Sequence, residues 1–362
     1  MEKETDQIKT ENPVTEKNFK IKTIASAAVV LIAALFLSLA GVIYFFSPEK
    51  DSFLGKVAEN FFYPAAVVES TNLIHGSVIR ENLAAIRKFY ESQDFSKIGM
   101  RVDFSTEEGK KRLKLKEKEI LNKAIEDKVI EILAKRRGIT IAKEDVDEVV
   151  SKELERLGTK EEVDGNLEKM YGWNLEQFKE RIVMPILYSQ KLEAEVAGEI
   201  SSDKKASELI EKAKKDLDEG KDFAEVARTY SQGASAQDGG DFGWIAKDQL
   251  LPEIAEKIFN AESVGKDKME IIESQLGYHI VKVEENKKED GVDMVRIRQI
   301  FARKMTFGDW LGEQMKNMSV SILLRDYYWD EQNAIVEFRE EQMKIFERET
   351  YEGSEGDISV MF

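Results

Sequence analysis

The chain has 362 residues, a net charge of −16, 42% hydrophobic and 34% charged residues, and no cysteine. At roughly 150 residues per domain, this length predicts two or three domains. The negative charge argues against a general nucleic-acid binder, which needs clustered Lys and Arg. The absence of cysteine excludes disulfides, thiolate metal sites and a cysteine nucleophile.

The first predicted element is an apolar segment, residues 24–46, which contains no charged residue. At about 1.5 Å per residue, a helix of this length crosses about 30 Å of hydrocarbon. Lysines precede the segment, which predicts that residues 1–23 are a cytoplasmic tail and that the chain after residue 46 is extracytoplasmic. We therefore predict a single-pass protein of the cell membrane, with a linker over 47–63. The alternatives are a signal peptide cleaved near Ser38–Ala40 and a buried helix of a soluble domain.

After the linker, residues 64–79 show two β-rich runs around Ser70–Asn72, which predicts a hairpin. The second run contains His75, one of only two histidines in the chain. A lone histidine at a polar strand edge is most simply structural, so His75 is not a candidate ligand.

Apolar residues then recur with helical spacing up to about residue 196. The clearest helix is predicted over Glu107–Arg137, and Gly138 ends it. Further helices are predicted over Ala142–Leu157 and Leu175–Ala197, the second with a kink at Pro185.

A group of short motifs follows in residues 220–283. A predicted helix with apolar positions ends in Arg-Thr-Tyr-Ser at residues 228–231, and the polar loop after it leads to Gly-Gly-Asp-Phe-Gly-Trp at 239–244. Leu-Leu-Pro-Glu-Ile-Ala follows at 250–255, and an alternating strand begins with Gly-Tyr-His-Ile at 277–280. In order and spacing, these motifs resemble those of the parvulin family of peptidyl-prolyl isomerases.

The resemblance implies an α+β domain with a four-stranded sheet and helices, acting on prolyl bonds without a cofactor or metal. Such a reaction only has to favour the twisted form of an amide whose rotation barrier is about 18–20 kcal/mol. By position, the resemblance gives catalytic roles to His279 and Gln299. It gives the proline pocket to Gly233, Leu250, Ile254 and Leu276.

Three of these positions depart from the family pattern. Gly233 stands where many parvulins have Cys or Asp, Ile254 where Phe is usual, and Leu276 where a polar residue is frequent. The family's first strand, which carries a second histidine, is missing before Ala206. Residues 294–303 alternate as such a strand would, with Gln299 in the histidine position. We therefore predict that 294–303 pairs with 277–283 and that the domain is in effect circularly permuted, since an empty central position would leave buried backbone groups unpaired.

The C-terminal part is predicted to contain a helix at 307–317, a strand at 320–328 and a charged helix at 331–350. A β-rich start followed by helices and a parvulin-like domain resembles SurA-type periplasmic chaperones and the membrane-attached foldases of bacteria without an outer membrane. In SurA-like proteins the C-terminal segment returns to the N-terminal domain, which implies that 320–328 pairs with the hairpin at 64–79.

The predicted division of the chain follows from these segments. It comprises the tail 1–23, the transmembrane helix 24–46, the linker 47–63, a mostly helical SurA-like chaperone domain 64–197, a parvulin-like domain 198–286, a strand–helix–strand segment 287–330 that completes the sheet, and a C-terminal helix with a disordered tail 331–362.

Together these features predict a membrane-anchored foldase that isomerises prolyl bonds in unfolded or newly translocated polypeptides. Its helical domain would hold extended clients on apolar surface, although a rigid helical spacer is an alternative. A non-catalytic holdase that retains a degenerate parvulin site is the main alternative function. A structural assembly factor for an envelope complex is the third.

Overall fold

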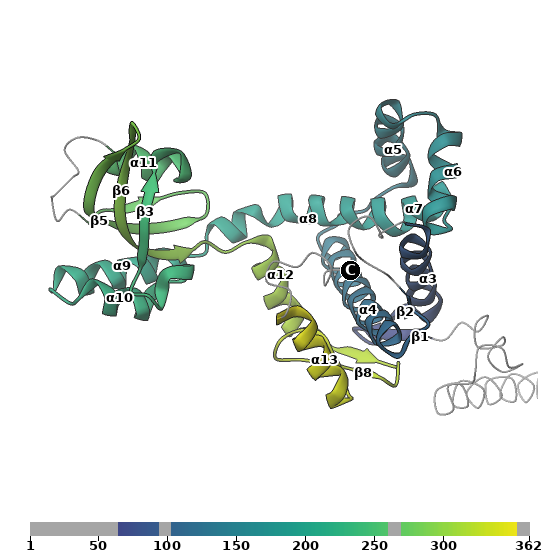
Figure 1. The fold of residues 1–362 in the computed structure, drawn as a ribbon. Helices are drawn as coiled ribbons and strands as arrows, with labels where there is room; N and C mark the ends of the chain where they lie inside the picture. The colour runs from purple at the N-terminus through teal and green to yellow at the C-terminus, as the bar shows by residue number, and fades with distance from the viewer. Residues whose placement is uncertain (1–63, 94–102, 260–268, 353–362) are drawn as a thin grey trace, which may run out of the picture. The chain divides into compact units, whose positions relative to one another are not determined.

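The structure is a computed structural model and describes residues 64–93, 103–259 and 269–352 (Figure 1). The chain divides into two compact units. One contains the segments up to Arg136, Thr140–Leu187 and the part from Lys316 onward, and the other contains Arg137–Ile139 and Tyr188–Met315. The second unit is therefore inserted between two segments of the first.

The first unit is built from helices and two small sheets. A three-stranded sheet has the order β2-β1-β7. Its strands are β1 (Pro64–Val68), β2 (Asn72–His75) and β7 (Val320–Ile322), and the second sheet pairs β8 (Tyr327–Asp330) with β9 (Ile335–Phe338). The helices are α3 (Gly76–Ser92), α4 (Glu107–Arg136), α5 (Lys143–Leu157), α6 (Lys160–Tyr171), α7 (Leu175–Phe178), the start of α8 (Met184–Ser201) and α13 (Glu341–Glu352).

The predicted return of the C-terminal part to the N-terminal hairpin is confirmed. β7 pairs antiparallel with β1, with Val320 opposite Val68 and Ile322 opposite Ala66. The predicted hairpin is shorter than expected, because residues 76–79 begin α3 and place Gly76 and Ile79 on its buried face. The predicted strand over 320–328 is divided between β7 and β8.

Two other predicted helices differ from the structure. The segment 331–350 is helical only from Glu341, because residues 335–338 form β9, in which Val336 and Phe338 alternate with more exposed neighbours. The segment Leu175–Ala197 is interrupted by a π-helical turn, Lys179–Val183, just before Pro185. Proline lacks the N–H that would continue the α-helical hydrogen-bond pattern, which explains the irregular turn.

The second unit contains a four-stranded antiparallel sheet in the order β3-β6-β5-β4. The strands are β3 (Asp241–Ala246), β4 (Ile271–Glu273), β5 (Gly277–Glu289) and β6 (Val292–Arg303). Its helices are the main part of α8, then α9 (Lys205–Asp218), α10 (Phe223–Tyr230), α11 (Pro252–Ile258) and α12 (Phe307–Lys316), with 3₁₀ turns at Ala234–Ala236 and Lys247–Gln249.

The predicted pairing of 294–303 with 277–283 is confirmed. Gly277 lies opposite Arg303, His279 opposite Phe301 and Val283 opposite Ile297. On its other side β6 pairs with β3, so the last of this sheet's four strands in chain order lies inside the sheet. The central position is filled from downstream, and no buried strand edge is left there without partners.

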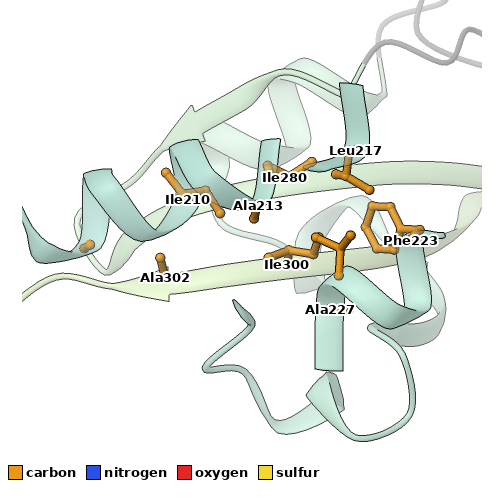
Figure 2. Close-up of a cluster of buried hydrophobic side chains, with 10 residues drawn as sticks. Ile210, Ala213, Leu217, Phe223, Ala227, Ile280, Ile300 and Ala302 are labelled. Atoms are coloured by element: carbon orange, nitrogen blue, oxygen red, sulfur yellow. The ribbon is translucent and has the colours of Figure 1, made fainter. Parts of the chain in front are cut away.

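Apolar side chains cover both faces of this sheet. Helices α9 and α10 pack on one face, where Ile280 and Ile300 meet Ile210, Leu217 and Phe223 (Figure 2). Helix α11 lies over the other face and packs on a second cluster. The residues of that second cluster are Ile245, Ile254, Ile258, Ile272, Val281, Val295 and Ile297. The sheet is thus fixed from both sides, which holds the side chains at the ends of β5 and β6 in place.

The predicted localisation requires correction. None of the helices in the described residues combines the length and the hydropathy needed to cross a membrane. This finding contradicts the predicted single-pass placement in the cell membrane, which we withdraw. The segment 24–46, on which that prediction rested, lies outside the described residues, as do the tail 1–23, the linker 47–63 and residues 353–362.

Candidate functional site

The candidate site is centred on His279 in β5, whose side chain is buried with 3% exposure. Both ring nitrogens have hydrogen-bond partners. Nδ1 lies 2.6 Å from Nε2 of Gln299 on β6, and Nε2 lies 2.7 Å from Oγ of Ser274. The two residues predicted as the catalytic pair are therefore in direct contact.

These partners bear on where the imidazole proton lies. The Gln299 amide is placed with its nitrogen toward Nδ1, and an amide nitrogen can only donate, so in this placement Nδ1 accepts and the ring proton is on Nε2. Nε2 then donates to the Ser274 hydroxyl oxygen, and the hydroxyl donates to the backbone carbonyl of Gly277 at 3.2 Å. A neutral imidazole thus uses both of its ring nitrogens in this chain.

Burial favours the same neutral form. Loss of water around the imidazole lowers the pKa of His279 to about 4, and the charge of Lys304 acts in the same direction. The carboxylate of Glu253 acts in the opposite direction but does not compensate. His279 is therefore neutral at pH 7, and it cannot supply a positive charge to a bound group.

The Ser274 hydroxyl is held by the turn between β4 and β5. Its Oγ accepts hydrogen bonds from the backbone N–H groups of Leu276 at 3.1 Å and Gly277 at 3.3 Å. Gly277 has to be glycine, because a Cβ at this position would lie 2.2 Å from the backbone oxygen of Ala302. The turn therefore fixes Ser274 against the ring.

The ring of Phe301 packs against the imidazole of His279. The two rings are stacked, with centroids 4.7 Å apart and an interplanar angle of 23°. The loop after α10 lies along the same part of β6, since the N–H of Gln232 donates to the Phe301 carbonyl at 2.7 Å and the Phe301 N–H donates to Oγ of Ser231 at 3.1 Å. These bonds hold the loop against β6 and bring Gly233 beside Phe301.

Gly233 leaves open space at that position. Its φ of −80° suits any residue, and a Cβ would have its nearest neighbour, Cβ of Phe301, at 3.6 Å. The glycine is therefore not required by the backbone, and a side chain here would lie beside Cβ of Phe301 and Oγ of Ser231.

The other predicted pocket residues have different surroundings. Leu250 and Ile254 both belong to the apolar cluster under α11, on the sheet face that carries His279, but Ile254 is 2% exposed and Leu250 is half-buried. Leu276 is 57% exposed at the β4–β5 turn, and it joins the hydrogen-bond chain through its backbone. Leu250 is thus the member of this set that combines a half-buried side chain with a place on the His279 face.

Sequence reasoning missed Ser274 and Phe301. The signal for Phe301 was present, because it lies two residues after Gln299 on a predicted strand and so shares its face. Ser274 offered a weaker signal, a single hydroxyl in the turn before Gly277. Its role depends on how that turn folds back on the ring.

The site contains uncharged donors and acceptors beside apolar surface. Ser274 Oγ lies 2.7 Å from His279 Nε2, but both residues are buried and Oγ already accepts from two backbone N–H groups, so the serine is not presented to a ligand as a nucleophile. Among the described ranges, no group of three or more His, Cys, Asp or Glu is placed to hold a metal ion. Such a set suits a reaction in which a ligand is held and desolvated, with no bond made or broken.

Comparison with known proteins agrees with this geometry. Residues 193–285 match the rotamase family, described as the PPIC-type PPIase domain. This match covers about a quarter of the chain and includes β3, β4 and most of the site, whereas Gln299 and Phe301 on β6 lie beyond it.

The chain is also similar to chaperones named SurA. It is 37% identical over 137 residues to Chaperone SurA of Methylobacillus flagellatus, which is 36% of this chain and 31% of that protein. It is 33% identical over 134 residues to Chaperone SurA of Burkholderia thailandensis, covering 35% and 29% of the two chains. It is 36% identical over 107 residues to Chaperone SurA of Idiomarina loihiensis, covering 27% and 24%. The matched stretch thus spans about a third or less of the length of these relatives.

Fold, site and similarity together define a class. The second unit contains a parvulin-type domain. The protein that carries it is SurA-like.

Proposed function

We propose that this protein is a folding helper that catalyses cis–trans isomerisation of prolyl bonds in unfolded polypeptides. The observation that carries the proposal is the neutral His279, with one nitrogen on Gln299 and the other on Ser274. In a sequence with two histidines and no cysteine, this arrangement uses one of the histidines to organise an uncharged, partly apolar site.

The reaction makes modest demands on such a site. The prolyl C–N bond rotates slowly because it has partial double-bond character, with a barrier of about 18–20 kcal/mol. A site that binds the twisted amide better than the planar one lowers this barrier, and each 1.4 kcal/mol or so gives a factor of ten in rate. Apolar contact with the proline ring and exclusion of water from the amide both act in this direction.

In this proposal the residues have distinct roles. His279 and Ser274 are buried and Gln299 is part-buried against the ring, so these residues fix the Phe301 ring and the β4–β5 turn. Phe301 and Leu250 offer half-buried apolar surface to the proline ring. Gly233 leaves room for the amide beside Phe301, and the exposed Leu276 contacts the flanking chain.

A second candidate function is client binding without catalysis, as in a holdase. The observation that favours it is Gly233, which puts no polar side chain beside the place of the amide. The buried Ile254 adds to this, because its side chain is part of the core under α11 and is withheld from a ligand.

One experiment separates the two functions. The full chain is tested for acceleration of cis–trans exchange in a short X-Pro peptide by NMR, and for suppression of aggregation of an unfolded protein. The isomerase proposal predicts acceleration that falls by about tenfold or more in His279→Ala, while His75→Ala retains it. Suppression of aggregation with no acceleration by the wild type would favour the holdase.

A further inference from the structure

Lys304 immediately follows β6, the strand that carries Gln299 and Phe301. Its Nζ donates to the backbone carbonyl of Ser274 at 2.9 Å and to Oε1 of Glu273 at 2.6 Å. Its backbone N–H donates to the carbonyl of Leu276 at 3.1 Å. Lys304 therefore binds three of the four residues 273–276, at the end of β4 and in the turn that leads into β5.

This turn and this strand carry the two hydrogen-bond partners of the imidazole. Ser274 binds Nε2 of His279 from the turn, and Gln299 binds Nδ1 from the strand. A displacement of the turn relative to β6 would lengthen one of these bonds, because the ring between them is rigid. Lys304, at the end of β6, is hydrogen-bonded to the β4–β5 turn, and these bonds oppose a displacement of the turn relative to β6.

The contacts of Lys304 suit positioning better than a contribution to stability. Its ion pair with Glu273 is solvent-exposed, with side-chain exposures of 34% and 62%, and exposed pairs stabilise proteins little. The bond to the Ser274 carbonyl is part-buried, and Nζ lies 5.1 Å from the centre of the Tyr278 ring, which restricts the side chain.

We propose that Lys304 is a positioning residue of the candidate site, which holds the Ser274 turn at the distance from Gln299 that keeps His279 in a single tautomer. The proposal rests on the proposed isomerase function for its kinetic consequence, but its structural consequence is independent of turnover. The charge of Lys304 also helps to lower the pKa of His279, after burial and against Glu253.

The test compares three variants of the full chain. Lys304→Met removes the ammonium group and keeps an unbranched stem, whereas Lys304→Arg keeps a charged donor that can reach both oxygens. Lys288→Met is the matched control, because it removes a lysine from an exposed ion pair with Asp293 (3.4 Å) in the β5–β6 hairpin, away from the site.

The first readout is kinetic. We expect Lys304→Met to lower kcat for X-Pro isomerisation by about tenfold, equivalent to about 1.4 kcal/mol, with KM changed by less than about threefold. Lys304→Arg should recover activity to within about threefold of the wild type, and Lys288→Met to within about twofold. A kcat within about twofold of the wild type in Lys304→Met would overturn the proposal.

The second readout is the tautomer of His279, from the ¹⁵N chemical shifts of the ring at pH 7.5, assigned with the help of His75→Gln. In the wild type and Lys304→Arg, Nε2 should be protonated and Nδ1 should accept. In Lys304→Met the two shifts should move toward each other, because the Ser274 partner is released. Unchanged shifts would overturn the proposal even if kcat falls, since a general loss of activity needs no role in positioning.

The two proposals fail in distinguishable ways. If the wild type does not accelerate isomerisation, the proposed function is wrong, and the ¹⁵N shifts alone decide the role of Lys304. If Lys304→Met does not fold, as judged by circular dichroism, then Glu273→Gln takes its place, because it weakens the anchor of Nζ from the other side. It must move the ¹⁵N shifts in the same direction, and its failure to do so would overturn the proposal.

Discussion

The buried His279 predicts a specific dependence of stability on pH. Its pKa is about 4 in the folded protein, compared with 6.5 for a free histidine. Between these values the unfolded chain binds a proton that the folded chain does not, so stability falls as the pH falls. The contribution of the neutral imidazole is complete above pH 6.5 or so, and it is lost progressively down to about pH 4.

The size of the effect follows from the two pKa values. At pH 5 the unfolded histidine is almost fully protonated and the folded one is about one-tenth protonated, which corresponds to at most about 2 kcal/mol of lost stability relative to pH 7.5. The perturbation is His279→Gln, which removes the titrating group and keeps a side chain that can hydrogen bond. The contributions of other titrating groups cancel when the free energy of unfolding of the variant is subtracted from that of the wild type.

The assay is urea unfolding of the full chain followed by circular dichroism at pH 7.5 and pH 5. The difference in the free energy of unfolding between wild type and His279→Gln should shrink by about 2 kcal/mol at the lower pH. His75→Gln, at an exposed position, is the matched control. A difference that stays constant, or grows, on acidification would refute the assignment of a buried neutral imidazole.

Three other predictions concern stability, each measured by urea unfolding at pH 7.5. Gly277→Ala should cost about 3 kcal/mol or more, because its Cβ would lie 2.2 Å from the Ala302 oxygen, whereas Gly233→Ala should cost less than about 1 kcal/mol, since its nearest neighbour is at 3.6 Å. Equal costs would contradict the close approach of β5 and β6. Ile254→Ala should destabilise by about 2–4 kcal/mol and Leu276→Ala by less than about 0.5, following their exposures of 2% and 57%; the reverse order would place Ile254 outside the core. Lys118→Met should cost about 3 kcal/mol, because it removes the cation that pairs with Glu337 (3.2 Å) and Glu347 (2.7 Å) in a largely buried cluster. Lys123→Met should cost little, because 61% of the Lys123 side chain is exposed. Similar small costs for both lysines would show that the Lys118 cluster is solvated.

The sequence was most informative where backbone geometry restricts the residue type. The motifs around Gly239–Gly240 and Gly277 carried the resemblance that predicted the sheet, and in the fold these glycines allow close contacts that a Cβ would block. The alternation in residues 294–303 predicted the pairing with β5, since an unfilled central position is costly. Gln299 lies opposite Val281 and reaches His279 diagonally on the same face of the sheet.

Helix α6 and strand β9 have local signals in the sequence that were not recognised. Helix α6 was not predicted, although Thr159 and Glu162 form a capping box at its start, with the Glu162 N–H bonded to Oγ1 of Thr159 at 3.2 Å. Strand β9 was predicted as part of a helix, although Asp330 accepts hydrogen bonds from the backbone of the turn before it and Val336 and Phe338 alternate with more exposed residues. Short strands of four residues carry too little periodicity to compete with a charged helical pattern.

The remaining features could not be predicted from local sequence. Ser274 and Lys304 matter because a turn and a strand end, 30 residues apart, meet in the fold. The burial of Ile254 and the exposure of Leu276 likewise depend on how α11 and the β4–β5 turn sit on the sheet. Such roles are set by tertiary contacts, which a single sequence does not display.

The most direct test of the account is the rate of cis–trans exchange of an X-Pro peptide in the presence of the full chain. We predict acceleration over the spontaneous rate, a loss of about tenfold or more in His279→Ala, and retention in His75→Ala. An exchange rate in the presence of the wild type that equals the spontaneous rate would contradict the proposed isomerase.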